Sequence, residues 1–188
     1  YSVQQTTDGG YIVCGGTIDI YLIKTDANGI EQWSQTFGGV GTDRGYSVQQ
    51  INDGGYILCG TTNSFLNGSS NIYLIKTDGN GVEQWSQIFG GMSNDYGRSV
   101  KQTNDGGFII IGVTESFANL IHNAYLIKTD SNGVEEWSQI YGDTASFGSS
   151  VQQTADGGYI ISGDYYDNDN SQTDLYLIKT DAVGQEQW

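Results

Sequence analysis

The apolar residues of this chain gather in short runs separated by polar, glycine-rich segments. Runs such as YIVCG (residues 11–15) and IYLIKT (residues 20–25) are too short for helices and show no helical periodicity, so they predict strands. A continuous apolar run of this length is typical of a strand that is buried on both faces. Asp-Gly-Gly and Asp-x-Asn-Gly lie between the runs and supply the backbone conformations of tight turns. The pattern therefore predicts an all-β fold made of hairpins.

The hairpins recur four times along the chain. One phrase, SVQQTTDGGYIVCGGT, starts at Ser2 and returns in close variants from Ser47, Ser99 and Ser150. A second phrase, YLIKTDANGIEQW, starts at Tyr21 and returns from Tyr73, Tyr125 and Tyr176. Spacing inside each phrase is the same in every copy, whereas the segments that join the phrases vary. The chain is therefore an internal repeat with two rigid frames per copy.

Each copy predicts four antiparallel strands, here lettered a to d in chain order. A single sheet of this kind cannot cover its two apolar faces, but copies stacked face to face around an axis can. We therefore expect one β-propeller domain over residues 1–188, with four near-identical four-stranded blades at 1–45, 46–97, 98–148 and 149–188. A linear β-solenoid is the alternative, although its turns are usually shorter and lack two hairpins per repeat.

The repeat also resembles a known group. Strand b ends in Gly, Tyr opens strand c and Trp lies in strand d, which resembles kelch-like propellers and the secreted propeller repeats of bacteria and archaea. The resemblance covers all four copies through short motifs. A paired glycine closes strand b only at Gly15-Gly16, and the other copies have one glycine there. The resemblance implies the fold rather than a kelch-type partner.

The number of blades in the assembled protein is open at this stage. The last copy stops at Trp188, and the first lacks the linker that precedes Tyr46. The four copies fit a small ring, part of a longer array, or half of an eight-bladed dimer. Uncovered apolar blade faces would drive association, so we expect self-association that completes a larger ring.

The net charge of the chain narrows the classes of molecule that it could bind. The chain has 7 basic and 22 acidic residues and a formal net charge of −15, which disfavours nucleic acids and anionic membrane surfaces. No apolar stretch is long enough to span a bilayer, so we expect no membrane insertion. Few lysines among abundant polar residues favour an extracellular or cell-surface setting.

The variable segments indicate where binding takes place. In a propeller, the b–c loops and the d–a linkers lie at one end and the tight a–b and c–d turns at the other. Varied loops on a constant scaffold usually carry binding, so we expect a protein or glycan ligand at the b–c loop face; tolerated insertions are the alternative. The candidate ligand-binding residues are Phe65, Asn67, Phe117, His122, Tyr165 and Tyr166.

One loop also suggests a metal-binding site. Asp167, Asp169 and Asp174 place oxygen ligands close together in the fourth copy, and the alternation Asp167-x-Asp169-x-Ser171 resembles the start of a calcium loop. The glycine and distant glutamate of an EF-hand are missing. A Ca²⁺ site and a solvated acidic loop are both open, and we expect no other cofactor.

The residues inside the frames predict structural roles. We expect turns at the Asp-Gly-Gly and Asp-x-Asn-Gly sequences, salt bridges to acidic residues from the strand-c lysines, and packing between blades by the strand-d tryptophans. Two cysteines, Cys14 and Cys59, occupy the same position in successive copies. Neighbouring blades hold such positions too far apart for a disulfide, so we interpret both as small buried residues.

The sequence gives little support for an enzymatic function. His122 is the only histidine and has no visible partner, and neither a zinc spacing nor a phosphate loop is present. Carboxylate pairs for glycoside hydrolysis are numerous, but none is singled out. We therefore predict a non-enzymatic binding or scaffold propeller. A carbohydrate-active enzyme with its site at the channel mouth and a purely structural array are the alternatives.

Overall fold

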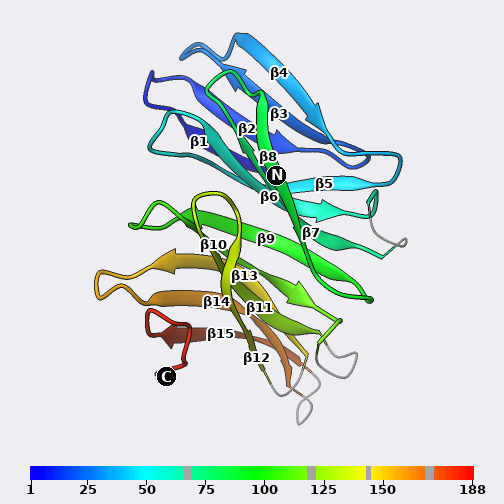
Figure 1. Ribbon diagram of the computed structural model, residues 1–188, viewed down its shortest axis with the longest axis vertical. Helices are drawn as coiled ribbons and strands as arrows, with labels where there is room; N and C mark the ends of the chain where they lie inside the picture. Colours follow the sequence, from blue (N-terminus) through cyan, green and yellow to red (C-terminus); the bar gives the residue numbers. More distant parts are fainter. Residues whose placement is uncertain (66–68, 118–121, 143–144, 168–171) are drawn as a thin grey trace.

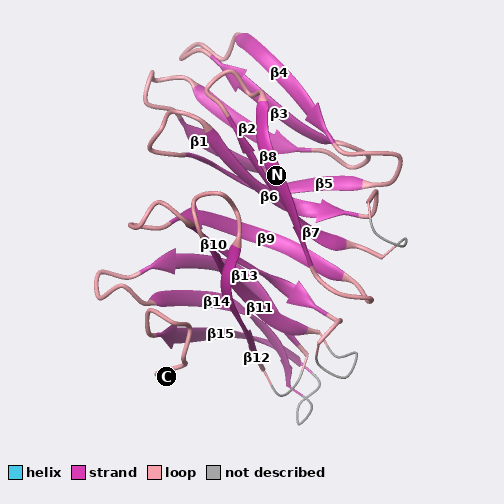
Figure 2. Ribbon diagram, viewed as in Figure 1, coloured by secondary structure: helices cyan, strands magenta, loops and turns pink. Residues whose placement is uncertain are grey.

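The computed structural model describes residues 1–65, 69–117, 122–142, 145–167 and 172–188. In these residues the chain forms fifteen strands in four antiparallel sheets (Figure 2), which confirms the all-β prediction. The described residues contain no helix long and apolar enough to cross a membrane.

The first three repeats contribute four strands each, and the fourth contributes three. The first sheet contains β1 (Ser2–Gln5), β2 (Tyr11–Gly15), β3 (Ile20–Thr25) and β4 (Glu31–Phe37). The second contains β5 (Asp43–Gln50), β6 (Tyr56–Thr62), β7 (Asn71–Thr77) and β8 (Glu83–Phe89). The third contains β9 (Asp95–Gln102), β10 (Phe108–Thr114), β11 (Asn123–Thr129) and β12 (Glu135–Tyr141). The fourth contains β13 (Ser146–Gln153), β14 (Tyr159–Asp167) and β15 (Gln172–Thr180).

Strands that are neighbours in sequence are neighbours in each sheet. The sheets stack in chain order, from the first at the top of Figure 1 to the fourth at the bottom. Their innermost strands β1, β5, β9 and β13 pack against the adjacent sheet. In the fourth sheet only the start of strand d is present: the Lys179 amide donates to the Trp188 carbonyl at 2.7 Å, and the Gln187 amide to the Lys179 carbonyl at 2.8 Å.

The innermost strands begin earlier than the SVQQ motif. They start at Asp43, Asp95 and Ser146, so the expected blade boundaries at 46, 98 and 149 lie inside β5, β9 and β13. A β-bulge in each of these strands follows or adjoins a glycine. That glycine lets the next blade approach, because a Cβ on Gly45 or Gly97 would collide with the thiol of the preceding blade.

Those thiols belong to Cys14 and Cys59, which are both free and completely buried. Burial in apolar surroundings raises the pKa of the Cys14 thiol to about 12, despite the nearby positive N-terminus. Both cysteines therefore act as small core residues, as the sequence predicts.

The core lies between the sheets. Three hydrophobic clusters join the first sheet to the second, the second to the third, and the third to the fourth. A strand-d tryptophan contacts the strand-b aromatic residue of the next blade at each junction. The ring centroids are 5.7 Å apart for Trp33–Tyr56, 5.8 Å for Trp85–Phe108 and 5.8 Å for Trp137–Tyr159. The prediction of packing between blades is confirmed for these three tryptophans.

The turns are held by their aspartates. Asp26 Oδ1 accepts hydrogen bonds from the amides of Asn28 at 2.8 Å and Ile30 at 2.9 Å, and Gly29 follows at a φ of 82°. In the other type of turn, Asp8 Oδ1 accepts from the Gly10 amide at 3.0 Å. These carboxylates close turns, as predicted.

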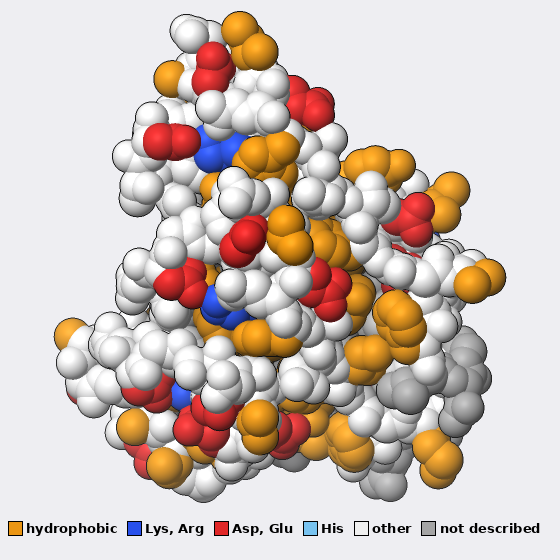
Figure 3. Space-filling model, turned by 45° about the horizontal axis from the view of Figure 1, so that its top comes forward, with side chains coloured by type: hydrophobic (Ala, Val, Ile, Leu, Met, Phe, Trp, Pro, Cys, Tyr) orange, Lys and Arg blue, Asp and Glu red, His pale blue; other side chains and the backbone are white. Residues whose placement is uncertain are grey.

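The strand-c lysines complete the same turns. Each ammonium pairs with the aspartate of Asp-Gly-Gly in its own blade, at 2.8 Å for Lys24–Asp8, 2.7 Å for Lys76–Asp53, 2.9 Å for Lys128–Asp105 and 2.9 Å for Lys179–Asp156. Figure 3 shows basic side chains isolated on the surface, each beside acidic and hydrophobic ones. The stems are buried and the charges are paired, so these lysines are structural.

Candidate functional site: the grooves between blades

Two predicted loop residues, Phe65 and Phe117, lie in the same place on successive blades. Each folds back from its b–c loop onto a tyrosine near the start of strand c. The ring centroids are 5.5 Å apart for both Phe65–Tyr73 and Phe117–Tyr125. Both phenylalanines stay about half exposed, whereas the tyrosines are buried. The loops therefore build a repeated pair of aromatic rings rather than unrelated insertions.

The second of these pairs, Phe117–Tyr125, lines a groove of about 680 Å³ between the second and third blades. The groove runs along the outer edge of the molecule, from the end of β8 towards the start of β12. It is lined by Ile88, Phe89, Gly90, Phe117, Tyr125, Glu135, Ser138, Gln139 and Ile140.

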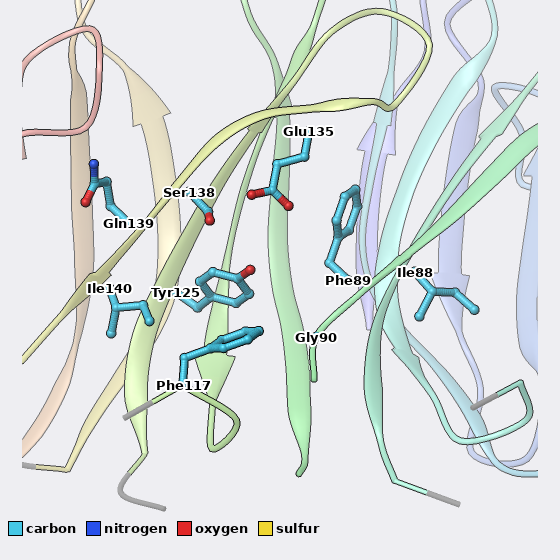
Figure 4. A pocket seen from close by; sticks show the side chains of 9 residues that line it. All are labelled: Ile88, Phe89, Gly90, Phe117, Tyr125, Glu135, Ser138, Gln139 and Ile140. Atoms are coloured by element: carbon cyan, nitrogen blue, oxygen red, sulfur yellow. The ribbon is translucent and has the colours of Figure 1, made fainter. Parts of the chain in front are cut away.

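Figure 4 shows how these side chains are arranged. The rings of Phe117 and Tyr125 lie one beside the other, and the polar groups of Glu135 and Ser138 lie above them on the same side. Phe89 closes the groove from the neighbouring blade. An exposed ring next to a carboxylate and hydroxyls suits a ligand with both an apolar face and hydrogen-bonding edges.

The buried tyrosine of this groove keeps its proton. Burial raises the pKa of Tyr125, and the hydrogen bond with Ser138 offsets only part of that effect. Its hydroxyl is therefore neutral over the whole physiological range. Glu135 is exposed and supplies the only carboxylate among the lining residues.

A second groove, of about 540 Å³, repeats this construction between the third and fourth blades. Tyr176 and Glu186 take the places of Tyr125 and Glu135, and Tyr165 supplies the aromatic side chain from the b–c segment. The Tyr176 hydroxyl is buried and has no hydrogen-bond partner among the described residues. Neighbouring residues on a strand face opposite sides, so Tyr166 is directed away from the groove that Tyr165 lines.

His122 lies elsewhere and, contrary to the expectation, has a partner. Its Nε2 is 2.6 Å from a carboxylate oxygen of Glu115, whose other oxygen accepts from the Asn94 amide group at 3.0 Å. The imidazole also stacks on Phe147, with ring centroids 5.0 Å apart. The sequence does not indicate this pair, because Glu115 lies at the beginning of the b–c loop and His122 at its end. Their proximity therefore depends on how the loop folds.

Phe147 also borders a cavity of about 440 Å³ at the centre of the blades. The cavity is lined by Tyr1, Tyr46, Arg98, Phe147, Ser149 and Asp164. Arg98 lies over the Tyr46 ring, 4.9 Å from its centroid. This axial cavity is thus a further place for a ligand, and it contains one described carboxylate, Asp164.

The predicted calcium loop is largely strand. Asp167 ends β14 and Asp174 lies in β15, paired in register with Tyr165, because the hairpin arms continue beyond the expected loop boundary. Asp169 lies outside the described residues, as does Asn67 of the candidate binding set. No group of three potential metal-binding side chains occurs in the described part of the chain. Calcium binding stays a prediction.

Sequence reasoning missed the strand residues of the grooves. Tyr125, Tyr176, Glu135 and Glu186 lie inside the repeated frames, where every residue was interpreted as scaffold. Tyr125 and Tyr176 lie near the start of strand c, beside the variable b–c segments, and this position is the signal that could have identified them. Glu135 and Glu186 follow the c–d turn at the opposite end of the blade and carry no such signal.

No protein-family model matches the chain, and neither does any curated protein. Among solved structures, the crystal structure of a thermostable family-43 glycoside hydrolase is similar to it, with a TM-score of 0.54 and 12% sequence identity. The match covers 92% of this chain and 70% of the hydrolase chain, which has a propeller fold. The chain is a β-propeller. At this identity the likeness establishes the fold of the propeller and leaves its activity open.

Proposed function

We propose that this propeller is a non-enzymatic glycan-binding protein and that the grooves between its blades are the binding sites. The observation that carries the proposal is the Phe117–Tyr125 pair beside Glu135 and Ser138. A sugar ring stacks its C–H face on an aromatic side chain, and its hydroxyls form hydrogen bonds with carboxylates and neutral hydroxyls. A glycan also fits the extracellular or cell-surface setting that the composition favours.

The repetition of the groove supports the same function. The two grooves are related by one blade step and have matching tyrosine and glutamate residues. Two similar weak sites on one rigid scaffold increase the overall affinity for a repeating ligand. A polysaccharide that presents the same unit many times is such a ligand. A protein ligand remains the alternative, and the kelch-like character of the repeats is a prediction that identifies no partner.

The test is a glycan array followed by titration calorimetry with the best-bound oligosaccharide. Phe117→Ala should weaken binding at the central groove about tenfold, which corresponds to about 1.4 kcal/mol. Met92→Ala is the matched control, because Met92 is fully exposed in the linker before β9 and does not line the groove. Absence of any bound glycan, or equal affinities for Phe117→Ala and wild type, would contradict the proposal.

The second candidate is a carbohydrate-active enzyme that works in the axial cavity. Two observations favour it: the likeness to a glycoside hydrolase and the Arg98 and Asp164 side chains in the cavity. Glycoside hydrolysis normally needs two carboxylic acids, and Asp164 is the only carboxylate among the residues that line the cavity. Release of reducing sugar from a bound polysaccharide, abolished by Asp164→Asn but not by Phe117→Ala, would favour this candidate over the binding protein.

A further inference from the structure

Two carboxylates are buried where the chain passes from one blade to the next. Asp43 begins β5 and Asp95 begins β9, the innermost strands of the second and third blades, and both side chains are completely buried. No lysine, arginine or histidine among the described residues forms an ion pair with either of them. Buried charges in proteins are normally paired with an opposite charge or bind a metal ion. Within the described part of the chain, these two carboxylates therefore lack a counter-charge.

One oxygen of each carboxylate has a structural role. Oδ2 of Asp95 accepts hydrogen bonds from the Gly91 amide at 2.8 Å and from the Ser116 hydroxyl at 2.6 Å. Oδ2 of Asp43 accepts from the equivalent amide and hydroxyl at the preceding junction, at 3.0 Å and 2.7 Å. Each aspartate thereby joins the linker that enters its blade to the start of the b–c loop of the same blade.

The other oxygen of each carboxylate, Oδ1, has no hydrogen-bond partner among the described residues. The side-chain oxygen of Asn71, which begins strand c of the second blade, is buried and lacks a described partner in the same way. Its amide nitrogen donates to the Ser69 carbonyl at 3.0 Å, and this bond fixes which side of the amide carries the oxygen. A Cβ on Gly90 would collide with both the Asn71 oxygen and the Asp95 carboxylate, so the two groups lie side by side. Oxygen atoms that only accept hydrogen bonds therefore converge here from two blades.

The three junctions between consecutive blades differ at these positions. Between the first and second blades, the half-buried Asp19 stands at the position of Asn71, so a second carboxylate is available beside Asp43. Between the third and fourth blades, Ser146 stands at the position of Asp95 and removes the carboxylate. The constellation of a buried aspartate and a further side-chain oxygen thus occurs at the first two junctions and is missing from the third.

We propose that Ca²⁺ binds at the first two junctions, on Asp43 and Asp95, and ties each linker to the preceding blade. Calcium prefers oxygen ligands and accepts carboxylates, side-chain amides, backbone carbonyls and water together. Such a site needs no cluster of three acidic side chains, and the described part of the chain has none. A small number of charged ligands gives weak binding, so we expect a dissociation constant of about 10⁻⁴–10⁻³ M, as in extracellular calcium modules.

The second of these sites adjoins the central groove. Gly90 and Phe117 line that groove, and Ser116, the residue before Phe117, donates to Asp95. A cation on Asp95 would hold the linker and the b–c loop in place, and these two segments contribute to the groove from different blades. Glycan binding at the central groove should therefore weaken when calcium is removed. This consequence rests on the proposed function, whereas calcium binding itself does not.

The test is a calorimetric titration of EDTA-treated protein with CaCl₂, followed by thermal unfolding with and without the cation. Wild type should bind two calcium ions per chain, and its unfolding midpoint should rise with calcium, because a ligand of the folded state stabilises it. Asp95→Asn should leave one site, and Asp43→Asn combined with Asp95→Asn should leave none. Asp105→Asn is the matched control, because it removes the same charge from an exposed turn and should keep both sites.

A variant that keeps Asp95 covers the case in which Asp95→Asn does not fold. Asn71→Asp places a second carboxylate beside the first, so it should bind calcium about tenfold more tightly at this junction. Without calcium the two buried carboxylates repel each other, and the unfolding midpoint in EDTA should fall below that of wild type. If a water molecule rather than a cation belongs between these oxygens, calcium would fail to restore the midpoint of Asn71→Asp.

Two results would overturn the proposal. One is a wild type that gives no binding heat and no change in unfolding midpoint with calcium in the millimolar range. The other is a double variant that still binds as many calcium ions as wild type, which would assign them elsewhere, such as the predicted loop at Asp167 and Asp174. The titration is done without glycan, so its outcome is independent of the proposed function. Glycan binding that persists in EDTA would leave the proposed function intact.

Discussion

The central and the terminal blades have nearly the same sequence and very different surroundings. Tyr73 and Leu74 of the second blade are buried, whereas Tyr21 of the first and Leu177 of the fourth are exposed. The register between strands b and c is the same in all of them. Burial of these side chains is therefore a property of a neighbouring blade rather than of the repeat itself.

The ion pairs of the turns, unlike the buried side chains, do not depend on a neighbouring blade. The lysine and aspartate of each blade belong to one sheet, so the pair forms equally in the first blade, between Lys24 and Asp8, and in the third, between Lys128 and Asp105. A blade thus forms the ion pair of its turn by itself and depends on its neighbours for its core. The following predictions separate these two contributions.

The largest difference is expected for one leucine position. Leu74→Ala should lower the free energy of unfolding by about 2–5 kcal/mol, because it leaves a cavity in a closed junction. Leu177→Ala should cost about 0.5 kcal/mol when the chain is monomeric, as an exposed substitution does. Urea denaturation at low protein concentration measures both. Equal losses would show that the fourth blade is covered in solution even as a monomer.

A smaller difference is expected between two turn glycines. Gly29 and Gly133 have φ angles of 82° and 78°, so alanine at either position adopts the same strained backbone. Only at Gly133 does the new Cβ also meet Trp85. Gly133→Ala should therefore cost about 1–3 kcal/mol more than Gly29→Ala, the usual range for overpacking. Thermal unfolding of the two variants measures the difference, and identical midpoints would mean that Trp85 moves aside freely.

The smallest effect concerns the ion pairs and pH. Burial alone would raise the pKa of Asp105, but hydrogen bonds from Lys128, Thr103 and the Gly107 amide lower it to about 2. The carboxyl pKa is lower in the folded chain than in the unfolded chain. The pair therefore stabilises the fold above a pH of about 4, and this contribution disappears as the pH falls towards 2.

Asp105→Asn should remove part of that acid sensitivity and cost under about 1 kcal/mol at neutral pH, because the carboxylate is largely exposed. Asp8→Asn in the terminal blade should act in the same direction, since Lys24 also lowers the pKa of Asp8. Unfolding midpoints measured between pH 2 and pH 7 test both variants. Acid sensitivity confined to Asp105 would show that the ion pair depends on neighbouring blades after all.

Much of the scaffold could be predicted from the chain alone. Repetition revealed the unit, Asp-Gly-Gly and Asp-x-Asn-Gly marked the turns, and the isolated strand-c lysines indicated ion pairs. These features depend on residues close together in one hairpin, and local chemistry decides them. The strand ends were less predictable: β14 extends to Asp167 because its polar residues continue the ladder with β15.

The candidate site was only half predictable. Phe65, Phe117 and Tyr165 stood out because they lie in variable segments. The structure places the two phenylalanines against strand-c tyrosines and Tyr165 in the same groove as Tyr176. Glu135 was not predicted, because nothing local distinguishes a scaffold glutamate from one that lines a groove. The Glu115–His122 pair was missed for a similar reason, since a whole loop separates the two side chains.

The sequence by itself determined the repeated four-stranded unit, its turns and the predominantly apolar character of both sheet faces, because each of these depends on a few neighbouring residues. Only the tertiary structure decided which copies of an identical side chain are buried and which grooves form between blades. The physical reason is that burial and concavity depend on pairs of surfaces. Leu74 and Leu177 have the same chemistry, and the blade that covers Leu74 makes it core.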